Sequence, residues 1–503
     1  MNADSPGGGS RRDGTPSIAA RRDALLAALA RVLPADALLH GERDLKPYEC
    51  DGLTAFRRLP LAVALPHDSA EVRAVLRTCG EHGVPVVARG AGTGLSGGAL
   101  PLEDGVVLGL ARLNRVLEID PRNRTARVQP GVTNLSISKA AAPYGLFYAP
   151  DPSSQIACTI GGNVAENAGG LHCLKYGLTT HNLLKVEIVT IDGERLTLGA
   201  DALDAPGYDL LALFTGSEGL LGVVVEVTVK LLPKPDAARL LLVAFASVDA
   251  AAAAVAAVIR AGIVPGGLEM MDRPAIEAVE AYVPCGYPTD AEAVLLCELD
   301  GTDAEVAEDA ARAEAVLRAA GATSIRVAID AAERAAAWAG RKAAFPALGR
   351  MAPDYYCIDG SIPRGRLPDV LRGIAALSRE YGLPVANVFH AGDGNLHPII
   401  LYDAANAGER DRTERLGTAI LALCVEAGGS VTGEHGVGVE KLDAMCTQFA
   451  SAEIECFHRI KRAFDPHGLL NPGKAVPTLA RCAEFGRMHV HRGALPFAEL
   501  ERF

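Results

Sequence analysis

Two histidines and a glutamate are the residues of this chain best suited to hold a metal ion. His390 ends an apolar run, and His397 follows seven positions later across a Gly-Asp-Gly turn. Histidine is a frequent ligand of divalent metals, and a turn can aim both rings at one point. Glu434, framed by Gly433 and Gly436, is the best candidate for a third ligand. We therefore expect a metal centre of His390, His397 and Glu434, although either histidine alone is better explained as a strand-end residue hydrogen-bonded to backbone.

A metal at this position would help to deprotonate an alcohol. A bound divalent cation lowers the pKa of a coordinated hydroxyl group. His435, adjacent to Glu434, is placed to accept the proton as a general base. The same ligands suit zinc, manganese, iron or cobalt, and they also suit a hydrolytic zinc enzyme. They therefore leave open whether the reaction is a dehydrogenation or a hydrolysis.

Three glycine-rich stretches, residues 89–98, 150–170 and 214–222, indicate a nucleotide cofactor. Glycine lets backbone N–H groups converge and lets a phosphate approach the chain closely. One such stretch could be an ordinary turn, but three together are better explained by a large cofactor. The residues that we predict to bind it are Arg89, Gly90, Ala91, Gly92, Thr93, Gly94, Ser96, Gly97, Pro150, Asp151, Ser153, Ser154, Gly161, Gly162, Asn163, Ala165, Asn167, Gly169, Gly170, Glu218, Gly219, Gly222 and Val223.

The first stretch contains a literal G-x-G-x-x-G, at Gly92, Gly94 and Gly97, but it does not indicate a Rossmann site. A Rossmann site needs a helix that begins at the motif and receives the pyrophosphate. Here Pro101 and an Asp-Gly turn follow almost at once, and residues 106–110 have the pattern of a strand. We therefore predict a strand–loop–strand whose loop binds the phosphates without a helix.

Together these motifs resemble those of the vanillyl-alcohol-oxidase and para-cresol-methylhydroxylase (PCMH) type of flavoprotein. Within that type the chain is similar to the FAD subunits of bacterial glycolate oxidases, with the D-lactate and D-2-hydroxyglutarate dehydrogenases as near relatives. The resemblance covers nearly the whole chain. It is carried by residues 89–98, 161–170, 338–346, 354–363, 390–397 and 433–436.

The resemblance implies an FAD-dependent dehydrogenase of 2-hydroxy acids such as glycolate and D-lactate, in which the C2 hydride passes to flavin N5. Arg341 matches the family's substrate arginine, whose planar guanidinium suits a carboxylate. Asn395 is expected to add a hydrogen bond to the substrate, and Asn471 to contact the cofactor.

At two positions the chain differs from relatives, and these differences bear on how the flavin is attached and on which substrates are expected. Thr93 stands near the position at which relatives with covalently attached flavin carry a histidine, so the FAD should be non-covalent. Cys357 stands where the 2-hydroxyglutarate enzymes have a lysine, which favours small monocarboxylates.

Several alternatives stay open. The chain could be a D-lactate or D-2-hydroxyglutarate dehydrogenase of the same family. A non-catalytic flavin subunit would need no His-His-Glu cluster, and a metallohydrolase without flavin would need no glycine-rich stretches. The chain has no Cys-x-x-Cys pattern for an iron–sulfur relay of its own. The family resemblance implies partners that carry electrons towards quinone: an iron–sulfur subunit and a second flavin-type subunit.

The elements that must position these residues divide into three parts and give an α+β fold class. Residues 17–235 should form a two-subdomain FAD-binding domain of the PCMH type, and residues 236–413 an α+β cap with an antiparallel sheet. Residues 414–503 should form a helical segment that completes the active site and returns to the first domain. Residues 1–16 should be a disordered tail.

Local patterns place some of these elements. We expect strands at residues 61–65, 84–88, 223–229 and 240–245, and helices at 25–33, 250–259, 304–320, 416–427 and 454–464. Ser69 should cap a further helix that runs to about His82, and Ser247 or Asp249 should cap the helix at 250–259.

Composition limits the class of protein. A length of 503 residues exceeds the ~250–300 at which one core stops growing. The net charge of −12 argues against a nucleic-acid partner. Eleven scattered cysteines indicate reduced thiols, and no targeting or spanning segment is evident. We therefore expect a cytoplasmic protein that reaches a membrane only through its partners.

Overall fold

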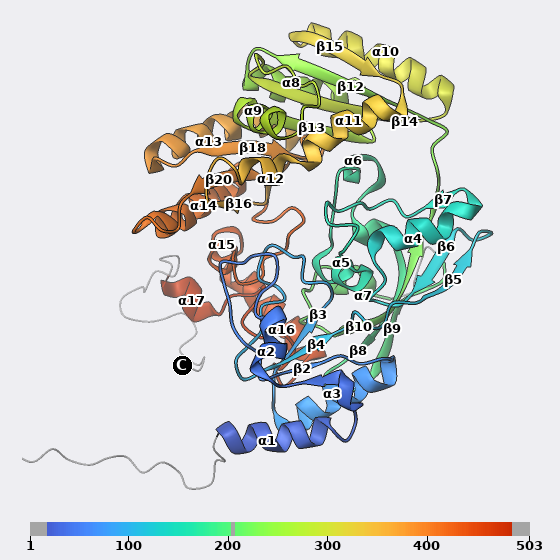
Figure 1. Ribbon diagram of the computed structural model, residues 1–503, viewed down its shortest axis with the longest axis vertical. Coiled ribbons are helices and arrows are strands. Elements are labelled where there is room, and N and C mark those ends of the chain that lie inside the picture. Colours follow the sequence, from blue (N-terminus) through green and yellow to red (C-terminus); the bar gives the residue numbers. More distant parts are fainter. Residues whose placement is uncertain (1–17, 203–206, 485–503) are drawn as a thin grey trace, which may run out of the picture.

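The protein is described by a computed structural model of residues 18–202 and 207–484 (Figure 1). The N-terminal half of the chain forms two smaller sheets at one end of the molecule, and a large sheet lies at the other end. The last helices return towards the first sheet. This mixture of helices and sheets confirms the predicted α+β fold class. The tail predicted for residues 1–16 lies outside the described residues.

The first sheet has the order β1-β2-β4-β3, in which β2, β4 and β3 run parallel. Helix α3 connects β2 to β3 and packs an apolar stripe against the sheet. The predicted cap Ser69 was wrong: Asp68 is the N-cap, because its carboxylate accepts the N–H groups of Ala70 and Glu71. The elements in chain order are α1 (Ile18–Leu29), β1 (Leu38–Leu39), α2 (Glu42–Leu45), β2 (Ala62–Ala64), α3 (Ser69–His82), β3 (Val86–Arg89) and β4 (Val106–Gly109).

The second sheet is antiparallel, with the order β5-β6-β10-β8-β9. The second glycine-rich stretch runs into α5, and the third runs directly into β10, the central strand. The elements are β5 (Val116–Asp120), β6 (Thr125–Val128), α4 (Asn134–Ala141), β7 (Leu146–Phe147), α5 (Ile160–Glu166), α6 (Cys173–Tyr176), β8 (Leu183–Val189), β9 (Arg195–Gly199), α7 (Leu210–Phe214), β10 (Val223–Lys230) and β11 (Leu232–Pro233).

The large sheet has seven antiparallel strands in the order β15-β12-β14-β13-β18-β20-β16. Its strands are β12 (Ala237–Phe245), β13 (Gly267–Asp272), β14 (Ala293–Gly301), β15 (Ala322–Ala328), β16 (Asp354–Cys357), β18 (Val385–Phe389) and β20 (Pro398–Tyr402). A short pair, β17 (Gly360–Ser361) and β19 (Asn395–Leu396), lies beside it.

Helices cover both faces of this sheet, which explains why consecutive residues of its inner strand β12 are apolar and buried. Alternate residues of a strand face opposite sides. In β12, Leu241 and Val243 pack on the side of α8 (Val248–Arg260), α10 (Asp303–Ala319), α13 (Leu367–Tyr381) and α14 (Glu409–Glu426). Leu240 and Leu242 pack on the side of α9 (Arg273–Tyr282), α11 (Ala331–Lys342) and α12 (Ala344–Leu348).

The C-terminal segment closes onto the first sheet. It contains α15 (Leu442–Gln448), α16 (Ser451–Phe464) and α17 (Leu479–Glu484). Leu470 forms a parallel bridge with Val86 of β3, and the N–H of Asn471 donates to the carbonyl of Val86. The expectation of uniformly reduced thiols was wrong, because Cys446 and Cys482 form a disulfide that joins α15 to α17. Among the described residues, no helix combines the length and apolarity that crossing a membrane requires.

Candidate active site

One cavity gathers the three glycine-rich stretches and the predicted metal centre. The predicted residues that line it are Gly90, Ala91, Gly92, Thr93, Gly94, Ser153, Ser154, Gly161, Gly162, Asn163, Ala165, Gly169, Glu218, Gly219, Gly222, Val223, Arg341, His390, His397, Glu434 and His435. Lining residues that sequence reasoning missed include Thr159, Glu166 and Phe345. Thr159 and Glu166 lie within a predicted glycine-rich stretch, and Phe345 lies within residues 338–346, which carry part of the family resemblance.

The first glycine-rich loop joins β3 to β4 without a helix, as predicted. At Gly90 a Cβ atom would collide with the Thr159 hydroxyl, and at Gly92, where φ is 71°, it would collide with the Arg89 guanidinium. A larger residue at either position would therefore displace a neighbouring side chain, and with glycine the loop lines the cavity without side chains there. Arg89 supports it from behind by donating to the carbonyl of Cys50.

Some of the predicted cofactor residues do not line the cavity: Arg89, Ser96, Gly97, Pro150, Asp151, Asn167, Gly170 and Asn471. Several of them support it instead. The Asn471 amide donates to the carbonyls of Gly98 and Glu218, at 3.0 and 2.6 Å, and so ties two glycine-rich loops together. Asp151 accepts from the ring Nδ1 of His172 at 2.8 Å.

Orphaned polar atoms at the cavity wall fit a large polar cofactor. The Thr159 hydroxyl and the Asn163 Nδ2 are buried without a hydrogen-bond partner in the described part of the chain. Buried polar groups are almost always paired, so both atoms are available to a bound molecule. An open backbone cradle with unpaired donors is what a dinucleotide such as FAD requires.

The predicted metal ligands converge on one point. The Nε2 atoms of His390 and His397 lie 3.2 and 3.1 Å from the same Glu434 oxygen, and ligand atoms of all three residues lie within 4.8 Å of one another. The other nitrogen of His390, Nδ1, lies 2.7 Å from a Glu269 carboxylate oxygen. A carboxylate behind a histidine fixes its tautomer and leaves Nε2 free to bind a metal. The donor set therefore fits a divalent metal.

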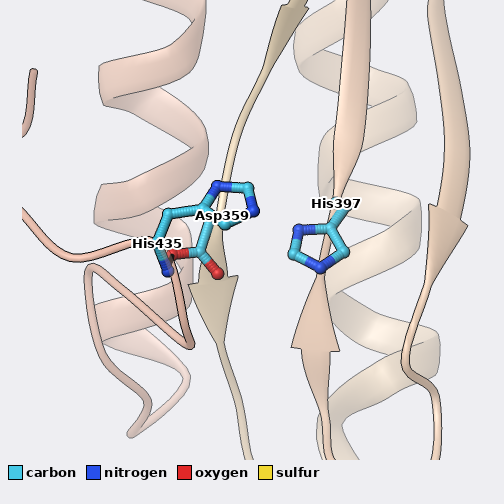
Figure 2. Close-up of side chains that lie close together, drawn as sticks. All are labelled: Asp359, His397 and His435. Carbon is cyan, nitrogen blue, oxygen red and sulfur yellow. Dashed lines mark hydrogen bonds between the residues drawn. The ribbon is translucent and has the colours of Figure 1, made fainter. Parts of the chain in front are cut away.

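Asp359, His397 and His435 form a second group of potential ligands (Figure 2). The Asp359 carboxylate is already occupied, however. It accepts the backbone N–H groups of Gly433, Glu434 and His435, and the Nζ of Lys441 at 2.9 Å.

Asp359 is therefore better placed to hold the Gly-Glu-His loop than to hold a metal. Sequence reasoning quoted its segment as a family motif but gave it no role.

The electrostatics of the cluster differ from residue to residue. Burial raises the pKa of Glu434, but His390 and His397 outweigh burial and hold that pKa well below its usual range. Burial lowers the pKa of His390, but Glu269 and Glu434 bring it well above the usual value. Burial lowers the pKa of His435 to about 4. The His435 ring is therefore neutral at physiological pH, and it stacks on His397 with ring centroids 5.0 Å apart.

Arg341 and Asn395, both predicted to contact the substrate, occupy different places. Arg341 lines the cavity, and its Nε donates to Glu269 at 2.8 Å. Asn395 lines an adjoining cavity on the other side of His390 and Glu434. Its amide donates to Asp359 at 2.7 Å, so it supports the loop that carries Glu434.

Comparisons with known proteins agree with this arrangement. Residues 60–199 match the family model described as an FAD binding domain, and residues 234–475 match that of the C-terminal domain of FAD linked oxidases. The chain is 64% identical to the glycolate oxidase subunit GlcD of Escherichia coli K12, over 96% of this chain and 97% of the relative.

It is 41% identical to the same subunit of Bacillus subtilis, over 86% of this chain and 93% of the relative. It is 34% identical to a D-lactate dehydrogenase of Anaerostipes hadrus, over 80% of this chain and 87% of the relative. The fold is similar to that of 4-ethylphenol oxidase from Gulosibacter chungangensis, with a TM-score of 0.77, 19% identity, and coverage of 93% of this chain and 99% of that one.

Proposed function

The chain belongs to the FAD-linked oxidases, in the group of bacterial glycolate oxidase FAD subunits, and we propose that this FAD-dependent hydroxy-acid oxidoreductase converts glycolate to the corresponding 2-oxo acid. The observation that carries the proposal is the single cavity in which a glycine-rich cofactor cradle meets a His-His-Glu cluster, a neutral histidine and an arginine. A hydrolase would need no such cradle, and a non-catalytic flavin subunit no such cluster.

The chain's own residues divide the work of the reaction. Arg341 binds the substrate carboxylate, because a guanidinium offers several donors to two oxygens at once. His435 accepts the proton of the C2 hydroxyl, since its neutral ring faces the cavity beside His397. When bound, FAD supplies the acceptor for the C2 hydride. A divalent metal held by His390, His397 and Glu434 would acidify the hydroxyl group.

Small substrates fit this site better than dicarboxylates do. Cys357 packs with apolar residues on the side of the large sheet that α9, α11 and α12 cover, and it does not line the cavity. The position that carries a lysine in 2-hydroxyglutarate enzymes thus offers no cation for a second carboxylate. D-Lactate is the second candidate substrate, supported by the similarity to D-lactate dehydrogenases. Rates of anaerobic flavin reduction by glycolate, D-lactate and D-2-hydroxyglutarate rank the three.

Two histidine variants test the division of roles. His390→Ala is expected to lose metal and activity together, because two ligands do not replace three. His435→Ala is expected to keep metal and FAD but to lose about 10²- to 10⁴-fold in turnover, the contribution of a general base. Metal analysis, flavin absorbance and anaerobic flavin reduction are measured on the same samples. Flavin reduction at the parent rate in His435→Ala would rule out His435 as the base.

The flavin in this proposal is bound without a covalent link, and its electrons leave through other proteins. Thr93 lines the cavity but offers no nucleophile for a flavin bond, so acid precipitation should release all the yellow colour. The relatives are named as subunits, which supports a multi-subunit complex. We infer that an iron–sulfur subunit and a second flavin-type subunit accept the electrons and provide any contact with a membrane. The isolated chain should then reduce a dye readily and oxygen poorly; rapid hydrogen peroxide formation would contradict this.

A further inference from the structure

One buried carboxylate touches both the proposed metal site and the proposed substrate arginine. Glu269 lies in the middle of β13 and is completely buried. One of its oxygens lies 2.7 Å from Nδ1 of His390, and the other accepts Nε of Arg341 at 2.8 Å. We propose that Glu269 is a positioning residue that couples the metal ligand to the substrate arginine. This inference rests on the function proposed above for those two residues.

The sheet topology explains why Glu269 can reach both partners. Strands β13 and β18 pair antiparallel, with Met270 opposite Phe389, so the next position of each strand places Glu269 opposite His390. Residues on either side of Glu269 in β13 are apolar and belong to the core. Arg341 comes from the last turn of α11, which covers this face of the sheet. A rigid central strand therefore holds the carboxylate, as a precise support requires.

The two contacts have different chemical consequences. Accepting the Nδ1 proton of His390 leaves the lone pair of Nε2 for a metal that Glu434 would also bind. Accepting Nε of Arg341 fixes the plane of the guanidinium and leaves its terminal nitrogens for a substrate carboxylate. Because one rigid carboxylate makes both contacts, the distance between metal and carboxylate clamp is set by Glu269. The pair then fits a 2-hydroxy acid, whose hydroxyl and carboxylate stand on adjacent carbons.

Glu269→Gln separates this role from the general demand for a buried side chain of that shape. A glutamine keeps the size, but it replaces one of the two carboxylate oxygens with an NH2 group and removes the negative charge from both contacts, so it cannot accept at both positions. In the FAD-loaded protein, the affinity for Zn²⁺ or Mn²⁺ is expected to fall about 10- to 100-fold. The KM for glycolate is expected to rise by about 10- to 100-fold, the value of a lost hydrogen bond to a charged group.

Glu298→Gln is the matched control. Glu298 is also an acidic residue of the large sheet, and it accepts from Trp338 of the same helix α11 at 2.6 Å. It touches neither His390 nor Arg341, so its variant should keep the parent metal affinity and KM. If both variants lost metal affinity and raised the KM for glycolate to the same extent, the cause would be a destabilised α11, and the proposal would be overturned.

The second test starts from the Arg341→Gln variant. In that variant, replacing Glu269 leaves no buried arginine without its carboxylate partner. There, adding Glu269→Gln should still weaken metal binding, because the His390 contact is independent of Arg341. It should raise the KM for glycolate no further, since the positioned group is already gone. A further rise in KM, or metal affinity at the parent level, would refute the positioning role. Metal affinity is measured on resting protein, so it tests Glu269 even if glycolate proves to be the wrong substrate.

Discussion

Replacing Asp359 with asparagine should destabilise the protein strongly, because it leaves a buried cation without its counter-ion. Asp359 and Lys441 are both fully buried, and their charged atoms lie 2.9 Å apart. Burial lowers the pKa of Lys441, but the carboxylates of Asp359, Glu440 and Glu218 together outweigh burial and raise that pKa above its usual value. Lys441 therefore stays charged. Removing one partner of a buried ion pair costs about 3–5 kcal/mol, and we expect Asp359→Asn to lose that much unfolding free energy.

The loop that carries Glu434 should loosen in the same variant. The backbone N–H groups of Gly433, Glu434 and His435 all donate to Asp359. An asparagine amide offers fewer acceptor sites and turns two of its own hydrogens towards these donors. Hydrogen exchange should therefore speed up in the peptide around residue 434, and activity should fall with it.

A double variant decides whether the unpaired charge is the cause. Asp359→Asn combined with Lys441→Met removes the orphaned cation, so it should be more stable than Asp359→Asn alone, by at least about 1 kcal/mol. Guanidinium unfolding of the FAD-loaded proteins, followed by circular dichroism, gives the free energies. The reasoning is refuted if Asp359→Asn loses less than about 1 kcal/mol, or if the two substitutions add without coupling.

Three further changes have definite expected outcomes. Burial raises the pKa of Asp272 to about 6. The protonated carboxyl group therefore stabilises the fold fully below about pH 4, and this contribution is lost as the pH rises through 6. Asp272→Asn should remove about 2–3 kcal/mol of the pH dependence of the unfolding free energy between those pH values, measured by guanidinium unfolding. Gly90→Ala should lower FAD occupancy in absorbance spectra because of the collision with Thr159, and adding Thr159→Ala should recover part of it; full occupancy in Gly90→Ala would contradict the proposed cradle. Serine at both Cys446 and Cys482 should destabilise the C-terminal segment by about 3–4 kcal/mol, the expected effect of opening a loop of 36 residues, and unchanged proteolysis of that segment would argue against the disulfide.

Local sequence patterns were sufficient for much of the fold. The Pro and Asp-Gly signals after Gly97 excluded a Rossmann helix, and the loop indeed joins two strands directly. The apolar run from Leu240 was correctly divided into a strand and a helix, with Ser247 as the cap. At α3 the prediction named Ser69, one position after the observed cap Asp68. Both residue types cap helices, and the sequence does not show which side chain reaches the free N–H groups.

The site was predictable where its residues share a motif and unpredictable where the fold alone brings them together. The grouping of His390, His397 and Glu434 followed from residue types known to bind metals. Glu269 lies 121 positions before His390, whose ring it contacts. Asp359 lies 75 positions before Glu434, whose backbone N–H it accepts. Their roles depend on the register of strands and on a return of the chain, which no local pattern records.

The bridge between Val86 and Leu470 has a consequence for how the protein is made. Strand β3 is synthesised nearly four hundred residues before Leu470, which pairs with its edge. Until Asn471 emerges, its amide cannot join the loops at Gly98 and Glu218, so the cofactor cradle of the nascent chain lacks this link. We therefore expect FAD to be captured after translation is nearly complete, and a chain truncated before residue 471 to yield a colourless product.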